Sequence, residues 1–259
     1  MAVAAALGLG LAAPRGADSA VFHPEGPTFF ELAQQALSST ERGYDLLAPK
    51  FDYTPFRTPD WLLELVGSYL NHVGPLETGL DLCCGTGAGL EVLRPLCRER
   101  VIGIDFSRGM LEVCRKKLAG GFGCAVDLVR GNVVKLPFDG AFDVVVCFGA
   151  FGHVLPRDEP RFVAEIARAL RPGGRFIFVT AYPPRWWSRR SVFARTFNAA
   201  MRVRNALFAP PFIMYYLTFL LPNVENLLRS QRLEAEIRDL GLGKPWTDLR
   251  LVVARRPRE

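Results

Sequence analysis

The chain has 259 residues, of which 49% are hydrophobic and 22% are charged, and its formal net charge is +6. This composition excludes a disordered chain, and the length suits one large domain. The six cysteines form no Cys-x-x-Cys pair and only three histidines are present, so we expect no metal site. Scattered unpaired cysteines are typical of a reducing cytoplasm.

Residues 1–13 are apolar, but no Lys or Arg precedes the run, and it is too short to span a bilayer. We therefore expect residues 1–27 to form a flexible tail, and a targeting role for residues 1–20 stays open. Two helical stretches are expected between Thr28 and Trp61, and a third over residues 61–70, where apolar residues recur at helical spacing.

The stretch Leu80 to Gly89 reads LDLCCGTGAG, an apolar run that leads into three glycines spaced two apart. Glycine lets the backbone adopt a positive φ and lets a ligand approach closely. A strand, a glycine turn and a helix N-terminus in this order hold cofactors in doubly wound α/β folds. Twenty residues beyond Gly85, a second apolar run ends at Asp105, whose carboxylate can accept both hydroxyls of a ribose.

From this point the chain alternates between strand and helix patterns, which is typical of a parallel sheet. Strands are expected over residues 79–83, 101–105, 126–130, 143–148, 176–180, 233–238 and 249–254. Helices are expected over residues 89–97, 107–119 and 160–170. The sequence thus predicts an α/β protein with a doubly wound sheet.

Five segments resemble the class I S-adenosyl-L-methionine (SAM)-dependent methyltransferases, of the broad group that includes small-molecule and quinone-pathway enzymes. They are Leu80–Gly89, Val101–Leu111, Gly131–Phe138, Phe142–Val154 and Leu170–Gly174. The resemblance implies a Rossmann-like fold with a mostly parallel seven-stranded sheet and an antiparallel edge. It also implies SAM as the cofactor, and a single domain over 28–259 with an N-terminal helical cap over 28–75.

The resemblance also assigns the cofactor-binding residues. Asp81 would organise the glycine turn, Gly85 and Gly87 would pass against SAM, and Asp105 would bind the ribose. Cys83 stands where the family usually has glycine, and we expect it to line the methionine end of the pocket. The remaining candidates are Phe106 and Met110 beside the adenine, Asn132 and Val133 at the adenine edge, and Cys147 and Phe148 near the sulfonium.

His153 is the one titratable residue that the resemblance puts between cofactor and acceptor. It is our candidate general base, and the alternative is a loop-stabilising hydrogen bond. Tyr44 or Tyr53 could reach the cofactor's carboxylate, or pack on the sheet edge. The run Cys147–Ala150 stands where nucleic-acid base methyltransferases carry an Asn-Pro-Pro-Tyr-like motif, so a nucleic-acid acceptor is disfavoured.

Residues 181–228 interrupt the α/β pattern and are interpreted as a lid insertion over the acceptor pocket. Residues 166–224 contain nine arginines and no acid, and the insertion is rich in aromatic residues. Phe193, Phe197, Ala200 and Met201 are expected on one helical face. We expect a small, apolar acceptor and contact with an anionic membrane surface, or alternatively a dimer interface. An RNA or protein methyltransferase that uses this basic stretch, or a non-catalytic scaffold, is the alternative.

Overall fold

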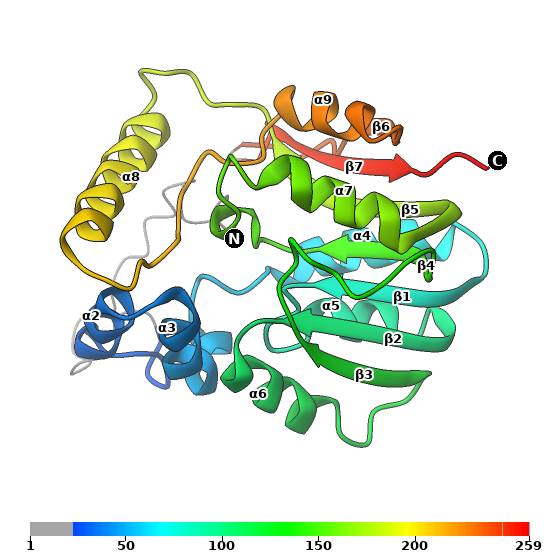
Figure 1. Cartoon of the computed structure of the whole chain (residues 1–259), viewed down its shortest axis with the longest axis horizontal. Coiled ribbons are helices and arrows are strands. Elements are labelled where there is room, and N and C mark those ends of the chain that lie inside the picture. Colours follow the sequence, from blue (N-terminus) through cyan, green and yellow to red (C-terminus); the bar gives the residue numbers. More distant parts are fainter. Residues whose placement is uncertain (1–22, 245, 259) are drawn as a thin grey trace.

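The computed structural model describes residues 23–244 and 246–258. A seven-stranded sheet with the order β3-β2-β1-β4-β5-β7-β6 forms its centre, and helices cover both faces (Figure 1). Strands β1 to β5 pair in parallel, whereas β7 runs antiparallel to both β5 and β6. The predicted doubly wound, mostly parallel sheet with an antiparallel edge is therefore confirmed.

The strands agree with the predicted order. They are β1 Leu76–Leu82, β2 Cys97–Asp105, β3 Ala125–Arg130, β4 Phe142–Cys147, β5 Leu170–Ala181, β6 Glu234–Asp239 and β7 Leu249–Arg255. The helices are α2 Phe29–Leu37, α3 Thr40–Leu47, the 3-10 helix η1 Ala48–Tyr53, α4 Asp60–Asn71, α5 Ala88–Leu93, α6 Arg108–Leu118, η2 Phe151–His153, α7 Glu159–Ala169, α8 Arg189–Leu207 and α9 Asn223–Ser230. The tail predicted over 1–27 lies outside the described residues, except for its last five.

Several predicted boundaries were wrong, and β1, β2 and β5 each begin earlier than expected, at Leu76, Cys97 and Leu170. The helix expected over 89–97 ends at Leu93, and β2 already begins at Cys97. The run Leu170–Gly174 (LRPGG), which joins the predicted helix over 160–170 to the predicted strand over 176–180, forms the start of β5, where the pairing with β4 shifts register between Phe142 and Val144. Glycine and proline mark an irregularity of the strand here rather than a separate loop.

Successive residues of β4 alternate between the two cores. Val145 packs with α7 and α9 in one core, whereas Val144 and Val146 pack with α4, α5 and α6 in the other. Side chains along a strand point alternately to the two faces, so a strand covered on both sides needs a continuous apolar run. This explains the three consecutive valines and fixes β4 in the middle of the sheet.

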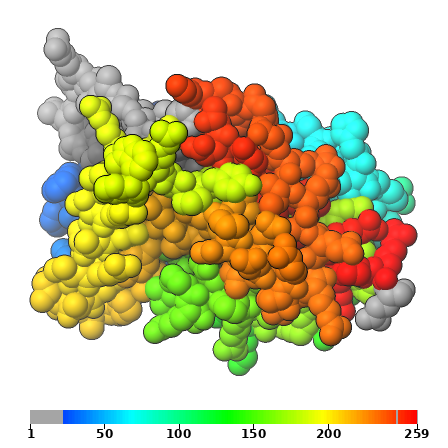
Figure 2. Space-filling model, turned by 90° about the horizontal axis from the view of Figure 1, so that it is seen from above, coloured from blue at the N-terminus to red at the C-terminus, as the bar shows by residue number. Residues whose placement is uncertain are grey.

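Between β5 and β6 the chain leaves the sheet and forms α8, a long irregular return, and α9. Helix α8 stands away from the sheet at the end of the molecule where α2 and α3 lie (Figure 1). Seen from above, α8 makes up one end of the surface (Figure 2). No helix within the described ranges combines the length and the apolar character that crossing a membrane requires.

The predicted helical face of α8 was partly wrong. Met201 is buried and Phe197 is half-buried, but Phe193 and Ala200 are exposed. The residues that α8 buries completely are Ser191, Ala194 and Met201. The face that packs on the protein therefore includes Met201 but neither Phe193 nor Ala200.

Candidate active site

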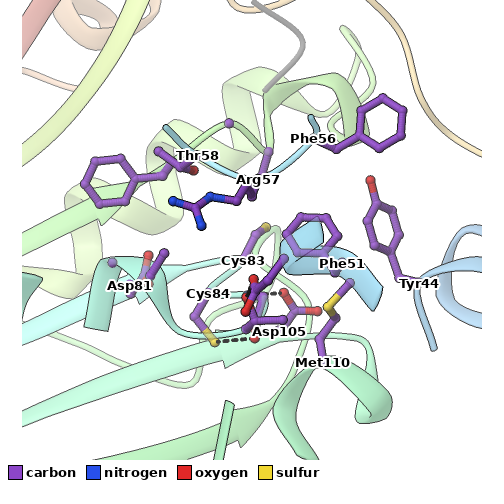
Figure 3. Close-up of a pocket in the computed structure, with 18 of the residues that line it drawn as sticks. Tyr44, Phe51, Phe56, Arg57, Thr58, Asp81, Cys83, Cys84, Asp105 and Met110 are labelled. Carbon is purple, nitrogen blue, oxygen red and sulfur yellow. Dashed lines mark hydrogen bonds between the residues drawn. The ribbon is translucent and has the colours of Figure 1, made fainter. Parts of the chain in front are cut away.

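A cavity of about 1110 Å³ opens at the carboxyl ends of β1, β2 and β4. The order of the sheet reverses between β1 and β4, and such a switch point is where doubly wound sheets bind ligands. The floor is formed by residues at or just beyond the ends of these strands, including Asp81, Cys83 and Asp105 (Figure 3). We call this space the first cavity.

The turn after β1 has the backbone that its glycines predict. Gly85 and Gly87 have φ values of 52° and 96°, and Cys83 has 54°. A positive φ is costly for a residue with a side chain, which explains why glycine is usual at the position of Cys83. A Cβ atom on Gly89 would lie 2.4 Å from Oδ2 of Asp81, so only glycine lets this carboxylate lie under the start of α5.

Asp81 is a buried carboxylate with one unpaired oxygen. Its side chain lines the first cavity, the residue is 2% exposed, and its Oδ2 atom has no hydrogen-bond partner among the described residues. Burial, followed by the nearby charge of Asp105, raises its pKa well above the ordinary value. An unpaired buried carboxylate is expensive unless a positive group binds it. The site therefore favours a ligand that brings an ammonium group.

Asp105 is held rigidly at the end of β2. Its Oδ2 accepts the N–H of Gly85 at 3.0 Å, and its Oδ1 accepts the N–H of Ser107 at 2.9 Å. Burial raises the pKa of Asp105 to about 6, although these backbone hydrogen bonds oppose the shift. Each carboxylate oxygen has a further lone pair, so the group can also accept two ligand hydroxyls.

The N-terminal helices form the opposite wall and are fixed to the sheet domain by two further acids. Oδ1 of Asp45 accepts the hydroxyl of Ser107 at 2.6 Å and the N–H of Gly109 at 2.8 Å, at the start of α6. Asp52 accepts the hydroxyl of Thr86, in the glycine turn, at 2.6 Å. These contacts place Tyr44 and Phe51 beside the cavity (Figure 3).

Known proteins are similar to this chain in sequence and in fold. A family model described as a methyltransferase domain matches residues 80–178. A demethylmenaquinone methyltransferase from Symbiobacterium thermophilum is 39% identical over 128 residues, which are 48% of this chain and 49% of that protein. One from Shouchella clausii is 31% identical over 170 residues, which are 63% of this chain and 71% of that protein. The chain belongs to the class I SAM-dependent methyltransferases.

The present chain spans about half the length of the Symbiobacterium relative that it matches. A solved structure, a SAM-dependent methyltransferase from Methanosarcina mazei, has the same fold, with a TM-score of 0.55 at 20% identity over 74% of this chain and 98% of that one. The segment that matches the family model runs from β1 into β5 and contains the residues of the cavity floor.

The residues of the first cavity fit SAM. The unpaired oxygen of Asp81 suits the ammonium group of its methionine part, and Asp105 suits the ribose hydroxyls. Apart from Arg57 and Lys117, the charged lining residues are acidic, which complements a cationic sulfonium. When bound, SAM supplies an electrophilic methyl group at its sulfonium.

Cys83 combines a cavity position with a protonated side chain. A hydrogen bond with the thiol of Cys147, together with burial, raises the pKa of Cys83 well above the ordinary value of a thiol. The thiolate is the nucleophilic form of cysteine, and a thiolate beside a sulfonium would itself accept the methyl group. The raised pKa keeps Cys83 as an inert part of the wall, in agreement with the expectation that it lines the pocket.

Eight of the twelve predicted site residues line the first cavity. They are Asp81, Cys83, Gly85, Asp105, Phe106, Met110, Phe148 and His153. The other four do not. Gly87 caps α5 instead, and a Cβ there would lie 2.7 Å from Sγ of Cys114. Cys147 lines a neighbouring cavity.

Asn132 and Val133 are not brought to the first cavity, so their predicted adenine contacts are absent from its lining. Oδ1 of Asn132 accepts the N–H of Val134 at 3.0 Å and closes its own turn, while Val133 packs against the core. One lone pair of the acceptor atom that we expected to bind a ligand is used by the backbone, and the adenine contact stays a prediction.

Several cavity residues were not predicted as site residues. Phe51, Asp52, Phe56, Arg57 and Thr58 come from η1 and the segment that follows it, and Figure 3 shows Arg57 across the cavity from Asp81 and Cys83. This stretch contains no glycine motif or apolar period from which a sequence argument could start. Of the two tyrosines proposed to reach the cofactor, Tyr44 lines the cavity, whereas Tyr53 is exposed and stacks on His23.

Tyr44 instead makes a hydrogen bond with His153. Its hydroxyl lies 2.8 Å from Nε2 of His153, and Nδ1 of His153 lies 2.6 Å from the carbonyl oxygen of Ile213. The carbonyl can only accept, so Nδ1 carries the proton and Nε2 accepts the hydroxyl of Tyr44. Burial lowers the pKa of His153 and raises that of Tyr44, so both groups are neutral. The pair joins α3, η2 and the segment after α8.

A second cavity of about 650 Å³ adjoins the first and shares Phe148 and Gly149 with it. Its other lining residues are Pro59, Trp61, Leu62, Cys147, Phe151, Val179, Thr180, Thr218, Leu220, Trp246 and Leu249. None carries a charge. The hydroxyls of Thr180 and Thr218 donate to the carbonyl oxygens of Phe219 and Phe151, at 2.7 Å and 3.0 Å. Its wall is therefore almost entirely apolar.

Proposed function

We propose that the protein transfers the methyl group of SAM to a small, apolar acceptor. The observation that carries this proposal is the uncharged second cavity, which adjoins the acid-lined cofactor cavity at Phe148 and Gly149. Methyl transfer is an in-line displacement, so aligning the two reactants and excluding water can supply much of the catalysis. Adjoining cavities of opposite character allow such alignment.

The lining of the second cavity supports an apolar acceptor. Both threonine hydroxyls already donate to the backbone, so few polar groups remain for a polar substrate. The relatives are named demethylmenaquinone methyltransferases, which is consistent with a quinone-type ring as the acceptor. An RNA or protein chain would need an open, charged approach, and these walls favour a small molecule instead. Oxygen, carbon and nitrogen remain alternatives for the acceptor atom.

The return segment after α8 is the proposed lid. Met214 and Tyr215 line the first cavity, and Thr218 and Leu220 line the second. The N–H of Tyr215 donates to the carbonyl of Gly152 at 2.9 Å, and a Cβ on Gly152 would lie 2.6 Å from the carbonyl oxygen of Tyr215.

We also propose that the enzyme works in the cytoplasm at an anionic membrane surface, where an apolar acceptor would concentrate.

We propose that His153 is a positioning residue rather than a general base. Both of its ring nitrogens are engaged, and the pKa shifts of His153 and Tyr44 oppose a charged pair. If His153 were a general base, His153→Ala would lower the turnover rate by at least about 100-fold, while Tyr44→Phe would keep most of the activity. A positioning role predicts losses below about fivefold in both variants. The pH profile of kcat/KM would then be the same in both variants as in the wild type.

Calorimetric titration with S-adenosylhomocysteine tests the cofactor site. Replacing Asp105 removes the acceptor of two ribose hydroxyls, so Asp105→Ala should cost about 1.5–3 kcal/mol of binding. Asp127→Ala on β3 is the matched control, because Asp127 is half-exposed and pairs with Arg100 away from the cavity. Unchanged affinity in folded Asp105→Ala, or binding of NADH in place of SAM, would contradict the assignment.

Incubation with SAM and a metabolite extract, followed by mass spectrometry, tests the transfer itself. The expected product is an apolar compound that is heavier by one methylene unit. Leu220→Asp, which adds a charge to the second cavity, should abolish this product and leave S-adenosylhomocysteine binding unchanged. A polar product that persists in Leu220→Asp would contradict the proposed acceptor class.

A further inference from the structure

Helix α8 buries polar residues against the protein. Asn198 and Tyr216 exchange two hydrogen bonds of 2.8 Å, from the Asn198 side chain to the backbone carbonyl and from the backbone N–H to the side chain. Asn205, two turns later, makes the same pair of bonds with the backbone of Phe212, at 3.0 Å and 2.9 Å. The return segment thus pairs its backbone with α8 side chains instead of with a strand.

Arg204 belongs to the same inward face. Its guanidinium donates to the carbonyl oxygens of Ala36, Ser38 and Pro210, at 2.9, 2.8 and 2.7 Å. It therefore joins α8 to the C-terminal end of α2. The polar residues of α8 are structural, and they share the inward side with the apolar residues Ala194 and Met201.

The outward face of α8 is correspondingly apolar. Val192, Val203 and Leu207 are 54%, 59% and 71% exposed, and Phe208, the residue after the helix, is 50% exposed. Thr196, Ala199, Ala200 and Ala206 lie on the same side of the helix and are exposed as well. Trp186 and Trp187, just before the helix, are 66% and 61% exposed. We call these residues the α8 outer face.

Arginines border the α8 outer face. Arg189, Arg195 and Arg202 are exposed, and none forms an ion pair with another described residue. No acidic residue occurs between Glu165 and Glu225 in the sequence. The face therefore combines exposed apolar side chains, two tryptophans and unneutralised positive charge.

We infer that α8 is an interfacial helix, which lies in the plane of an anionic lipid surface with its outer face in the headgroup region. An apolar stripe bordered by arginines, with tryptophan near its end, matches the chemistry of that region. A protein partner would have to offer an acidic, apolar groove of the same length, whereas an anionic bilayer offers both properties everywhere on its surface. Charge complementarity thus selects the lipid.

This inference deepens the proposed function and rests on it only for the role of the contact. The return segment that lines both cavities is bonded to the inward face of α8, so a docked helix would hold the cavity wall close to the lipid. An apolar acceptor could then pass from the bilayer to the second cavity over a short distance. Binding to lipid requires neither SAM nor turnover, so a failure to bind vesicles would overturn the lipid contact and leave the proposed methyl transfer standing.

Co-sedimentation with vesicles of phosphatidylcholine and phosphatidylglycerol tests the contact. The full chain should bind these vesicles at low salt, bind less at high salt, and bind pure phosphatidylcholine weakly. Arg189→Gln, Arg195→Gln and Arg202→Gln combined should reduce binding at least tenfold, since each basic residue near the surface contributes about fivefold. The fluorescence of Trp186 and Trp187 should shift to shorter wavelength on binding.

A matched control replaces three exposed basic residues elsewhere: Arg115→Gln, Lys116→Gln and Arg161→Gln. It lowers the net charge equally but should leave vesicle binding within about twofold of the wild type. Val203→Gln with Leu207→Gln should weaken binding at high salt, where only the apolar contact remains. Equal losses in the two triple variants would mean that net charge alone attracts the lipid, and would overturn the inference.

Two further outcomes would also overturn it. One is no binding to anionic vesicles at any salt concentration. The other is a dimer in sizing chromatography that Val203→Gln and Leu207→Gln dissociate, since a second copy would then cover the face. Vesicle binding without any methyl transfer would contradict the proposed function and leave the lipid contact standing.

Discussion

The cofactor edge of the sheet buries apolar strands, whereas helix α8 turns several polar side chains inward. In both regions the groups that the inward side chains meet explain the choice. At the cofactor edge, apolar strands lie inside and two carboxylates, Asp81 and Asp105, face a cavity. At α8, Asn198, Arg204 and Asn205 lie inside beside Ala194 and Met201, while Val192, Val203 and Leu207 face outward. In each region the inward side chains match the partners available, which are strands in one and an unpaired backbone in the other.

The largest expected effect concerns the inward face of α8. Asn205→Ala leaves the N–H and carbonyl of Phe212 without partners, at about 1–3 kcal/mol for each buried group. We expect the free energy of unfolding, measured in urea, to fall by about 2–5 kcal/mol. Asn71→Ala, on an exposed asparagine at the end of α4, is the control and should change it by less than about 0.5 kcal/mol. A loss below about 1 kcal/mol in Asn205→Ala would show that the backbone of Phe212 does not depend on the Asn205 side chain.

The second prediction concerns the opposite region. Asp81→Asn removes a buried carboxylate whose pKa is raised, so the cofactor-free protein should become about 1 kcal/mol more stable at neutral pH. The same change removes the charged partner of an ammonium group and should cost about 1.5–3 kcal/mol of S-adenosylhomocysteine binding. Thermal unfolding and calorimetry measure the two effects. Unchanged binding together with lower stability would show that Asp81 is structural rather than a ligand group.

The third prediction is the pH dependence that Asp105 imposes. Its pKa of about 6 lies above the ordinary value, so the cofactor-free fold binds the proton more tightly than the unfolded chain. This contribution to stability is complete below the unfolded pKa of about 3.9 and is lost as the pH rises through about 6.

Cofactor binding needs the ionised carboxylate, so its dependence on pH has the opposite sign. The affinity for S-adenosylhomocysteine should fall by up to about tenfold per pH unit below about 6. Calorimetry between pH 5 and 8 measures this, with Asp105→Asn as the control that should flatten the profile near pH 6. A wild-type profile that stays flat across this range would show that Asp105 does not control binding.

The smallest expected effect is the change in the free energy of unfolding when the α8 outer face is made polar. Val203→Gln and Leu207→Gln replace exposed apolar side chains that the fold does not use, so the free energy of unfolding should change by less than about 0.5 kcal/mol. Urea unfolding of this variant beside Asn205→Ala measures both faces of one helix. A loss above about 1.5 kcal/mol would show that the outer face packs against this protein after all.

The sequence by itself determined the sheet and the floor of the cofactor site. The glycine turn and the two strands that carry Asp81 and Asp105 are local features, in which each residue's neighbours in the chain set its backbone conformation and its face. The positions of Asp81, Cys83, Gly85 and Asp105 follow from that local pattern. For the same reason, the apolar run of β4 was enough to predict a strand there.

Only the tertiary structure decided the opposite wall and the orientation of α8. Asp45 and Asp52 find their partners 62 to 64 and 34 residues away, and no local pattern encodes contacts at such separations. Helical periodicity places Phe193, Phe197, Ala200 and Met201 near one another, but it cannot tell which side of the helix will meet the protein. The backbone of residues 212–216 decided that side, because its buried N–H and carbonyl groups needed polar partners and α8 supplied them.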